Sequence, residues 1–475
     1  MNGFSPKSIF PLIALGLILV VQAGLTFLDA TPRYLMGDSG SYLWSMYNGG
    51  PWDRSWTYPA WFLRPLIGFH SVQLVVYVQI ALGLIPAWLA FRLVSGPCGR
   101  GCGFVGVATA ILCLIEPLAL TYQRFILTDS LGLVMSAAAL FLCVRVIDRS
   151  AGATAYAALA PPFMVLAASL RTAQVPSLAM LSLFLLILLF LVYRDYRSGA
   201  ALLASLIVCQ AVFSHYAIKN QGVPGYNAAS GRFMLAAVLP IVSRDDVQPY
   251  IDPERVRAIL DDQAKNRRER PGELFQPGQA ADQILQASGS PREGNRLSGR
   301  IAEHAILRDP IGFLALAWST WLDYFDEPDI VGRVLEEAGD REFDPGLSPY
   351  FAELRIYDAV DTHSVQSPVR RYFEAAWKYY GWIPAISAML LAASLAADRR
   401  LSTLTLAAFA LASAASHIAF STESVPRYFT VSAWANVVVA GRIACVLATR
   451  LSAHPPRPPS VLSAQVNLER HHWLA

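Results

Sequence analysis

The sequence predicts an all-α membrane protein that crosses the bilayer many times. Of its 475 residues, 54% are hydrophobic and only 15% are charged, whereas a soluble domain carries about 25% charged residues. Several apolar stretches are about 20 residues long, which is enough to cross roughly 30 Å of hydrocarbon as a helix. The net charge of +3 is too small to indicate nucleic-acid binding.

Ten stretches have the length and composition of membrane helices. The first is longer than the apolar core of a signal peptide, so we expect it to be retained. Pro or Gly interrupts several of the ten, which membrane helices tolerate. The predicted helices are 9–28, 72–94, 104–121, 127–147, 155–170, 176–193, 200–217, 379–397, 402–420 and 428–449.

Basic residues predict the orientation of these helices, because loops on the cytoplasmic side carry an excess of Lys and Arg. The rule places the N-terminus inside and leaves 29–71 and the long segment 218–378 outside. The residues that carry the rule are Lys7, Arg92 with Arg100, Arg145 with Arg149, Arg194 with Arg197, and Arg399 with Arg400.

The chain then divides into four parts. Residues 1–217 form a seven-helix module with the external loop 29–71, and 218–378 form a helical external lobe. The apolar stretch 311–325 within that lobe is expected to be an interfacial helix; if it crossed the membrane, the protein would have eleven spans. Residues 379–449 supply the last membrane helices, and the Pro-rich tail 450–475 is expected to be disordered and cytoplasmic.

The six cysteines do not indicate a secreted disulfide framework, because none lies in the long polar segments. Cys98 and Cys102 are close together in a Gly-rich stretch. A zinc site needs four ligands, and no second pair stands nearby. A turn between helices is the better interpretation.

The predicted topology gathers polar residues on the outer side. Asp38 directly follows the first helix, where a carboxylate is costly beside lipid and suggests a task. Arginine binds phosphate through a planar fork, and a carboxylate accepts a proton or holds a divalent metal. The gathered residues are Asp38, Tyr42, Asp53, Arg54, Trp56, Tyr58 and Arg64 in the first loop, Glu116, Arg124 and Asp129 between the third and fourth helices, Arg171, then His215, Tyr216 and Lys219, and Glu423, Arg427 and Tyr428 before the last helix.

Each of these residues also has a structural interpretation. Asp38 and Asp129 are suited to cap the helices that follow them, with the first of those helices beginning near Tyr42. Arg124 and Arg171 are suited to anchor helix ends at the interface. Arg427 with Tyr428 fits an interface belt, and His215 fits a packing role. These alternatives stay open at this point.

The order and context of four short motifs resemble the GT-C class of membrane glycosyltransferases, more narrowly the protein O-mannosyltransferase and lipid A aminoarabinose transferase group. The resemblance covers 9–217 and the last helix best. The external segment 218–378 has no counterpart, and Ser39 stands where the group often has a second acid. The motifs are Gly37-Asp38-Ser39, Thr128-Asp129-Ser130-Leu131, Leu170-Arg171-Thr172, and Glu423 followed by Arg427-Tyr428.

The resemblance implies a hexosyl- or pentosyltransferase of the bacterial inner membrane. Its donor would be a polyprenyl-phosphate-linked sugar, and its acceptor a lipid, glycan or protein on the periplasmic face. Asp38 would be the general base of an inverting transfer. The remaining roles are phosphate binding for Arg124, Arg171 and Arg427, and support or acceptor binding for Tyr42, Asp129, His215, Glu423 and Tyr428. No cofactor is implied with certainty; a divalent metal would rest on Asp38, and a single carboxylate is a poor metal site.

Three other functions compete with this one. An O-antigen polymerase or ligase depends on arginines in its large external loop, and Arg292, Arg296 and Arg300 are candidates. A lipid or polysaccharide transporter typically has charged residues near the bilayer midplane and internal repeats, and neither is visible here. A non-catalytic assembly protein would depend on no single acid.

Overall fold

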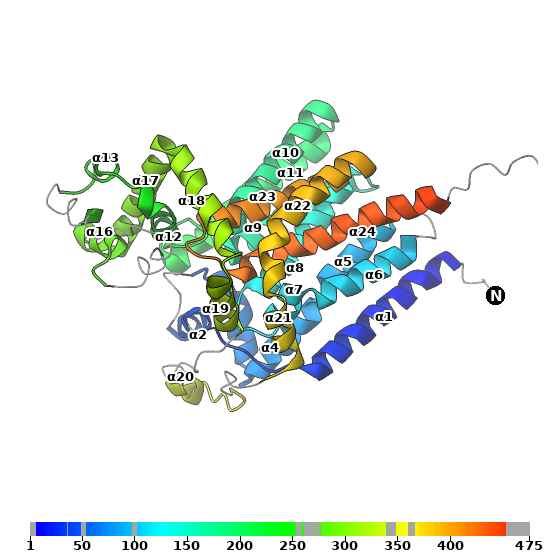
Figure 1. Cartoon of the computed structure of the whole chain (residues 1–475), viewed down its shortest axis with the longest axis horizontal. Coiled ribbons are helices and arrows are strands. Elements are labelled where there is room, and N and C mark those ends of the chain that lie inside the picture. Colours follow the sequence, from blue (N-terminus) through cyan, green and yellow to red (C-terminus); the bar gives the residue numbers. More distant parts are fainter. Residues whose placement is uncertain are drawn as a thin grey trace, which may run out of the picture.

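The computed structural model is a bundle of long helices with a helical lobe at one end (Figure 1). It describes residues 6–35, 37–48, 54–96, 102–252, 259–260, 270, 277–338, 348–359 and 366–452. Within these residues, nine helical stretches are long and apolar enough to cross a membrane. The predicted all-α, multi-pass fold is thereby confirmed. The start of α1, at Pro6, lies at the end of the bundle away from the lobe.

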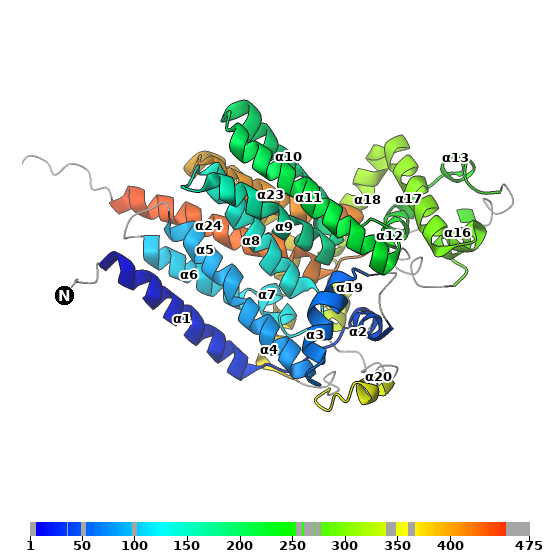
Figure 2. The ribbon, with the colours of Figure 1, turned by 180° about the vertical axis from the view of Figure 1, so that it is seen from behind.

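The bundle is built from helices at both ends of the chain. Figure 2 shows α1 along one edge and the hairpin of α10 and α11 along another. The bundle helices are α1 (Pro6–Leu28), α4 (Val72–Leu82), α5 (Leu84–Ser95), α6 (Cys102–Ile115), α7 (Pro117–Tyr122), α8 (Asp129–Ile147), α9 (Ala153–Leu170), α10 (Val175–Ile187), α11 (Tyr196–Gln221), α22 (Trp377–Ala397), α23 (Leu401–Phe420) and α24 (Thr430–Ser452).

The predicted span 104–121 is two helices rather than one. Helix α6 ends at Ile115, and α7 begins at Pro117 with Glu116 as its N-cap. The Glu116 Oε2 accepts a hydrogen bond from the Ala119 N–H at 2.7 Å. Proline has no N–H and clashes with the preceding turn, so it suits the first position of a helix and ends the one before it.

Helix α8 lies at the centre of the bundle and is its most buried span. Its neighbours include α5 and α9, together with α23 and α24 from the other end of the sequence. A disulfide between Cys102 and Cys445 joins the start of α6 to α24. No sequence pattern indicates this pair, because 343 residues separate the two cysteines; Cys98 lies outside the described residues.

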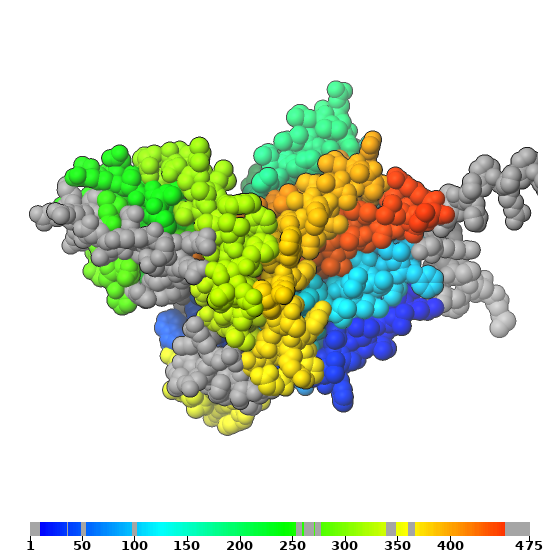
Figure 3. Space-filling model, in the orientation of Figure 1, coloured from blue at the N-terminus to red at the C-terminus, as the bar shows by residue number. Residues whose placement is uncertain are grey.

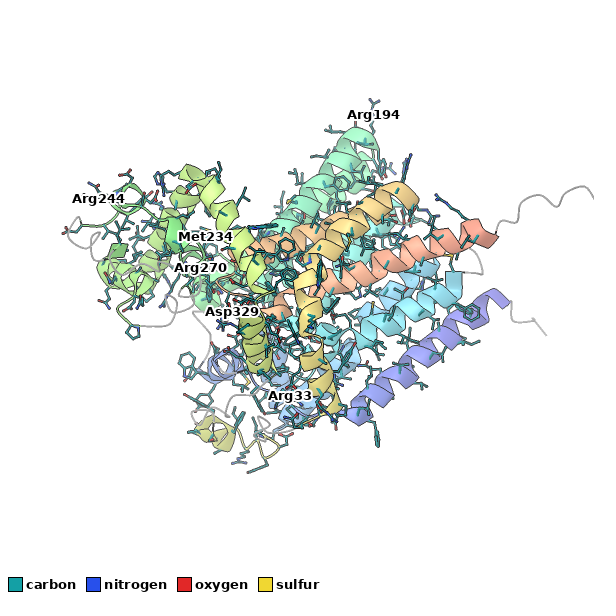
Figure 4. The ribbon with its side chains drawn as sticks, in the orientation of Figure 1. Arg33, Arg194, Met234, Arg244, Arg270 and Asp329 are labelled. Atoms are coloured by element: carbon teal, nitrogen blue, oxygen red, sulfur yellow. A yellow bond between two sulfur atoms is a disulfide. The ribbon has the colours of Figure 1, made fainter. Side chains whose placement is uncertain are left out.

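The lobe has a hydrophobic core of its own, with Leu235, Ile284 and Ile301 at its centre. Figure 3 shows the lobe projecting from one end of the bundle. In Figure 4, Arg244 lies at its outer edge, whereas Arg194 lies at the tip of α10. Among the described residues, the α-helices between α11 and α22 are α12 (Ser230–Val238), α13 (Arg244–Val247), α16 (Ala280–Ser288), α17 (Pro291–Arg308), α18 (Pro310–Asp323), α19 (Glu327–Glu337), α20 (Ser348–Glu353) and α21 (Pro368–Ala375).

Helix α18 covers the predicted interfacial stretch. It has 14 residues, and Ile311, Leu314, Trp318 and Leu322 are exposed along one side. Their spacing of three and four residues puts them on a single helix face. An apolar face that is open to the surroundings fits a helix lying against lipid, and the interfacial placement stays a prediction.

Candidate active site

Asp38 is the first residue of α2 (Asp38–Asn48) and forms ion pairs with two arginines. Its Oδ2 lies 2.7 Å from Arg427 Nη1, and its Oδ1 pairs with Arg54. Burial raises the pKa of Asp38, but Arg427 and Arg54 outweigh burial and hold that pKa at about 2. Asp38 is therefore a carboxylate at neutral pH.

Two backbone hydrogen bonds hold the first loop against the segment that precedes α8. The Arg33 N–H donates to the Arg124 carbonyl at 2.8 Å, and the Ile126 N–H donates to the Arg33 carbonyl at 3.1 Å. The Gln79 side-chain amide donates to the carbonyls of Gln123 and Phe125 and holds the same segment from the other side. Residues that are distant in sequence thereby reach one end of the bundle.

Arg171 ends α9 and pairs with Asp129, the first residue of α8. The two side chains meet at 2.6 Å between Arg171 Nη2 and Asp129 Oδ1. The same nitrogen donates to the Arg427 carbonyl at 3.2 Å. The aliphatic part of Arg171 crosses Gly132, where a Cβ would lie 2.9 Å from Arg171 Cγ. The absence of a side chain at Gly132 therefore allows Arg171 to take this position.

Tyr428 lies against both guanidinium groups. Its ring centroid is 5.0 Å from the Cζ of Arg171 and 5.4 Å from that of Arg427. The imidazole of His417 stacks on the same ring, with 5.7 Å between the ring centroids. A cation over a Tyr ring is attracted by the negative face of the ring. Tyr428 thereby helps to keep two positive charges close together.

These side chains line a cavity of about 500 Å³ at the lobe end of the bundle. The cavity contains Asp38, Tyr42, Arg171, Arg427 and Tyr428, which the sequence singled out. The remaining wall includes hydroxyl groups, from Ser55, Thr128, Ser169, Thr172, Ser230 and Ser421. It also includes apolar side chains of α10, α12 and α23, namely Val175, Pro176, Phe233, Met234 and Phe420. Figure 4 labels Met234, where α12 of the lobe meets the bundle.

Four of the candidate residues do not line this cavity, namely Arg124, Asp129, His215 and Glu423. Arg124 is fully buried and donates to two backbone carbonyls near the end of α1, at 2.7 and 2.9 Å. His215 is exposed on α11. Glu423 pairs with Arg333 at 2.6 Å. The Arg124 guanidinium therefore holds the end of α1. We leave Arg124 and His215 out of the proposed site.

The structural alternatives for Asp38 and Asp129 also change. The helix expected near Tyr42 begins at Asp38 itself, so the carboxylate belongs to the first turn. A negative charge there is favourable for the helix dipole, and the ion pairs with arginine are compatible with that role. Thr128 precedes α8 as its N-cap residue, and Asp129 points its carboxylate at Arg171 instead.

Sequence reasoning missed Glu337, the last residue of α19. Its Oε2 accepts a hydrogen bond from the Tyr122 hydroxyl at 2.6 Å, and its Oε1 lies 3.5 Å from Arg427 Nε. Burial raises the pKa of Glu337 to about 7, although Arg427 and Tyr122 act in the opposite direction. No local pattern distinguishes Glu337 from the other acids of 326–377, because its contacts come from the folding of the lobe onto the bundle.

The residues of this site do not suit a divalent metal ion. Within the part of the chain that the structure describes, no three His, Cys, Asp or Glu side chains are grouped closely enough to hold one. Both oxygens of Asp38 already face arginines. A cation would have to displace these positive groups, so the proposed transfer reaction does not use a metal ion.

The comparisons with known proteins add one structural similarity. No protein-family model matches the sequence, and no curated protein matches it. The fold is similar to the crystal structure of ArnT from Cupriavidus metallidurans in the apo state, over 94% of this chain and 78% of that one. The TM-score is 0.35 and the identity 12%. These values are too low to support conclusions about the site, which therefore rest on its own residues.

Proposed function

We propose that this membrane protein transfers a sugar from a polyprenyl-phosphate donor to an acceptor on the periplasmic face of the bacterial inner membrane. The observation that carries the proposal is the Asp38–Arg427 ion pair in a cavity that Arg171 also lines. Such a cavity offers a carboxylate for an acceptor proton and guanidinium groups for a phosphate. The periplasmic side rests on the distribution of basic residues.

In this mechanism the donor phosphate lies against Arg171 and Arg427. A guanidinium fork matches the geometry of phosphate oxygens. As the acceptor oxygen or nitrogen bonds to the anomeric carbon, the bond from that carbon to the phosphate oxygen breaks. The electron pair leaves with the polyprenyl phosphate, and the arginines stabilise its growing negative charge. Attack from the opposite face inverts the configuration.

Asp38 accepts the proton that the acceptor loses. A carboxylate with a pKa of about 2 is a weak base, and an ideal base has a pKa near the working pH. A donor phosphate that draws Arg427 toward itself weakens the Asp38–Arg427 pair and makes the carboxylate more basic. Donor binding would thus prepare the base, since one guanidinium serves both anions.

The apolar chain of the donor has a suitable groove beside the cavity. A second hollow of about 330 Å³ lies between α10, α22 and α23 and is lined almost wholly by apolar side chains. Its residues are Ser177, Met180, Leu181, Phe184, Leu391, Leu395, Leu401, Leu404, Thr405, Ala408, Phe409 and Ala412. We propose that prenyl units lie here, in contact with the bilayer.

The arginines of the rival polymerase do not line the cavity. Arg292, Arg296 and Arg300 belong to α17 of the lobe, and none of them contributes to its wall. Arg296 pairs with the exposed Glu293 one turn before it. The contacts of the described residues therefore favour the site around Asp38 over one on α17.

Comparative mass spectrometry of envelope lipids and glycans, with and without the gene, tests the proposal. The expected result is the loss of one sugar from one acceptor, with accumulation of the unused lipid-linked donor. An unchanged set of glycans would overturn the proposal. Lipid transport without cleavage of the bond between sugar and phosphate, measured with the purified protein in vesicles, would favour a transporter.

A further inference from the structure

His417 is a buried polar side chain that the proposed mechanism does not use. It lies near the end of α23 and is 2% exposed. Among the described residues, neither of its ring nitrogens has a hydrogen-bond partner. Buried polar groups in proteins are nearly always paired, and an exception calls for an explanation. A bound molecule is one such explanation, because His417 lines the cavity that contains Asp38.

The surroundings of His417 identify the kind of ligand. Its ring stacks on Tyr428, whose ring also lies against the Arg171 guanidinium. His417 therefore lies beside the part of the cavity where Arg171 and Arg427 attract an anion. An imidazole donates from one ring nitrogen and accepts at the other. A phosphate oxygen is a suitable partner for the donor nitrogen.

The apolar groove continues from the same place. Pro176 lines the polar cavity and Ser177 lines the groove, so the two hollows follow each other along α10. Ala412 lines the groove on α23, five residues before His417, which is about 7.5 Å along a helix. His417 thus stands where a polar head group would join an apolar chain.

We propose that His417 binds the phosphate of the lipid-linked donor, on the side where the prenyl chain is attached. This inference rests on the proposed function and adds a third phosphate-binding side chain to Arg171 and Arg427. His417 can donate a directed hydrogen bond to the phosphate. Neither of its ring nitrogens is paired with a carboxylate among the described residues, so the phosphate has no such partner to displace. In contrast, Arg171 and Arg427 are held by Asp129 and Asp38 before the donor arrives.

Binding of farnesyl phosphate to the purified full-length protein tests the inference, with farnesol as the ligand that lacks the phosphate. His417→Phe keeps a ring against Tyr428 but cannot hydrogen-bond. We expect it to weaken farnesyl phosphate binding about tenfold and to leave farnesol binding unchanged. His417→Gln, which can still donate a hydrogen bond, should restore most of the affinity. His215→Phe, at an exposed position on α11, is the matched control.

Two results would overturn the inference. One is wild-type affinity for farnesyl phosphate in His417→Phe. The other is an equal loss of affinity for farnesol, which would make His417 part of the apolar wall only. If His417→Phe does not fold by size exclusion and thermal melting, His417→Leu replaces it; its side chain has no hydrogen-bond donor and should lose phosphate affinity in the same way.

The binding assay is independent of sugar transfer, so the two proposals can fail separately. If the His417 variants lose phosphate affinity while deletion of the gene leaves every glycan unchanged, the transferase proposal fails and the phosphate site stands. If deletion removes a sugar while His417→Phe binds farnesyl phosphate normally, only the role of His417 fails.

Discussion

Replacing Gly132 with alanine should displace Arg171 without removing any charge from the site. The added Cβ would lie 2.9 Å from Arg171 Cγ and 3.9 Å from its Cδ. Two carbon atoms prefer a separation of about 3.5–4.0 Å, so the Arg171 stem must move by roughly 0.6–1.1 Å. A shift of that size disturbs the 2.6 Å contact of Arg171 with Asp129 and its approach to a bound phosphate.

The expected effect follows from the bond at risk. A hydrogen bond to a charged group contributes about 1.5–3 kcal/mol, which corresponds to roughly ten- to hundredfold in affinity. We therefore expect Gly132→Ala to weaken farnesyl phosphate binding by about tenfold or more, measured by thermophoresis on the purified protein. The melting temperature should change little, because alanine favours a helix more than glycine does and this gain offsets part of the clash.

Gly24→Ala on α1 is the matched control, since a Cβ there meets nothing within 4 Å. It makes the same chemical change in another membrane helix and should leave binding unaltered. Equal affinities for Gly132→Ala, Gly24→Ala and the wild type would refute the placement of Arg171 at the phosphate.

Two further predictions concern acids outside the membrane helices. The pKa of Glu337 is raised to about 7, so lowering the pH from 8 to 6 should remove most of its negative charge beside Arg427. The KM for the phosphodiester donor should then fall about three- to tenfold. Glu337→Gln should abolish this pH dependence, and the same pH dependence in that variant would contradict the role of Glu337 beside Arg427. In the lobe, burial raises the pKa of Asp246, but hydrogen bonds from Arg308 and Ser243 hold it at about 2. Asp246 should therefore stabilise the lobe above about pH 4 and lose this effect as the pH falls toward 2. Asp246→Asn should speed hydrogen exchange in α17 at neutral pH, with a loss of about 1–3 kcal/mol in the free energy of protection. The control Asp282→Asn should leave this exchange unchanged. Unchanged exchange in Asp246→Asn would show that the hydrogen bonds of Asp246 do not hold the lobe together.

The membrane helices could be predicted from the sequence because length and hydrophobicity alone determine whether a helix can cross a bilayer. Nine of the ten predicted spans correspond to a long apolar helical stretch among the described residues; 72–94 is one of them, because α4 and α5 follow each other directly at Gly83. The exception, 104–121, shows the limit of that reasoning. Pro117 leaves the apolar character of the stretch intact, but the helix is interrupted there, and Glu116 caps the shorter helix that follows.

The sequence predicts Asp38 as a site residue because a carboxylate beside lipid is costly, and Arg171 and Arg427 because arginine binds phosphate. The three side chains line one cavity, and their roles stay predictions. Arg124 met the same criterion, yet its guanidinium satisfies backbone carbonyls around the end of α1. A sequence does not distinguish these two uses of a buried arginine, because both depend on which chain segment packs against it.

Glu337 and His417 were missed for a related reason. Glu337 lies in an acid-rich segment where many carboxylates look alike, and only the packing of α19 brings it to Arg427. His417 lies within an apolar stretch, where a histidine usually packs as a neutral core residue. Its lack of a hydrogen-bond partner among the described residues is a property of the folded cavity.

The most direct test of the central claim is the replacement of Asp38 by asparagine. The gene-deletion strain would carry the wild type, Asp38→Asn or the control Asp282→Asn at equal membrane levels, and mass spectrometry would measure the glycan lost on deletion. General base catalysis contributes about 10²- to 10⁴-fold, so Asp38→Asn should restore less than about 1% of the wild-type transfer rate, whereas the control restores it fully. Wild-type transfer by Asp38→Asn would contradict the account.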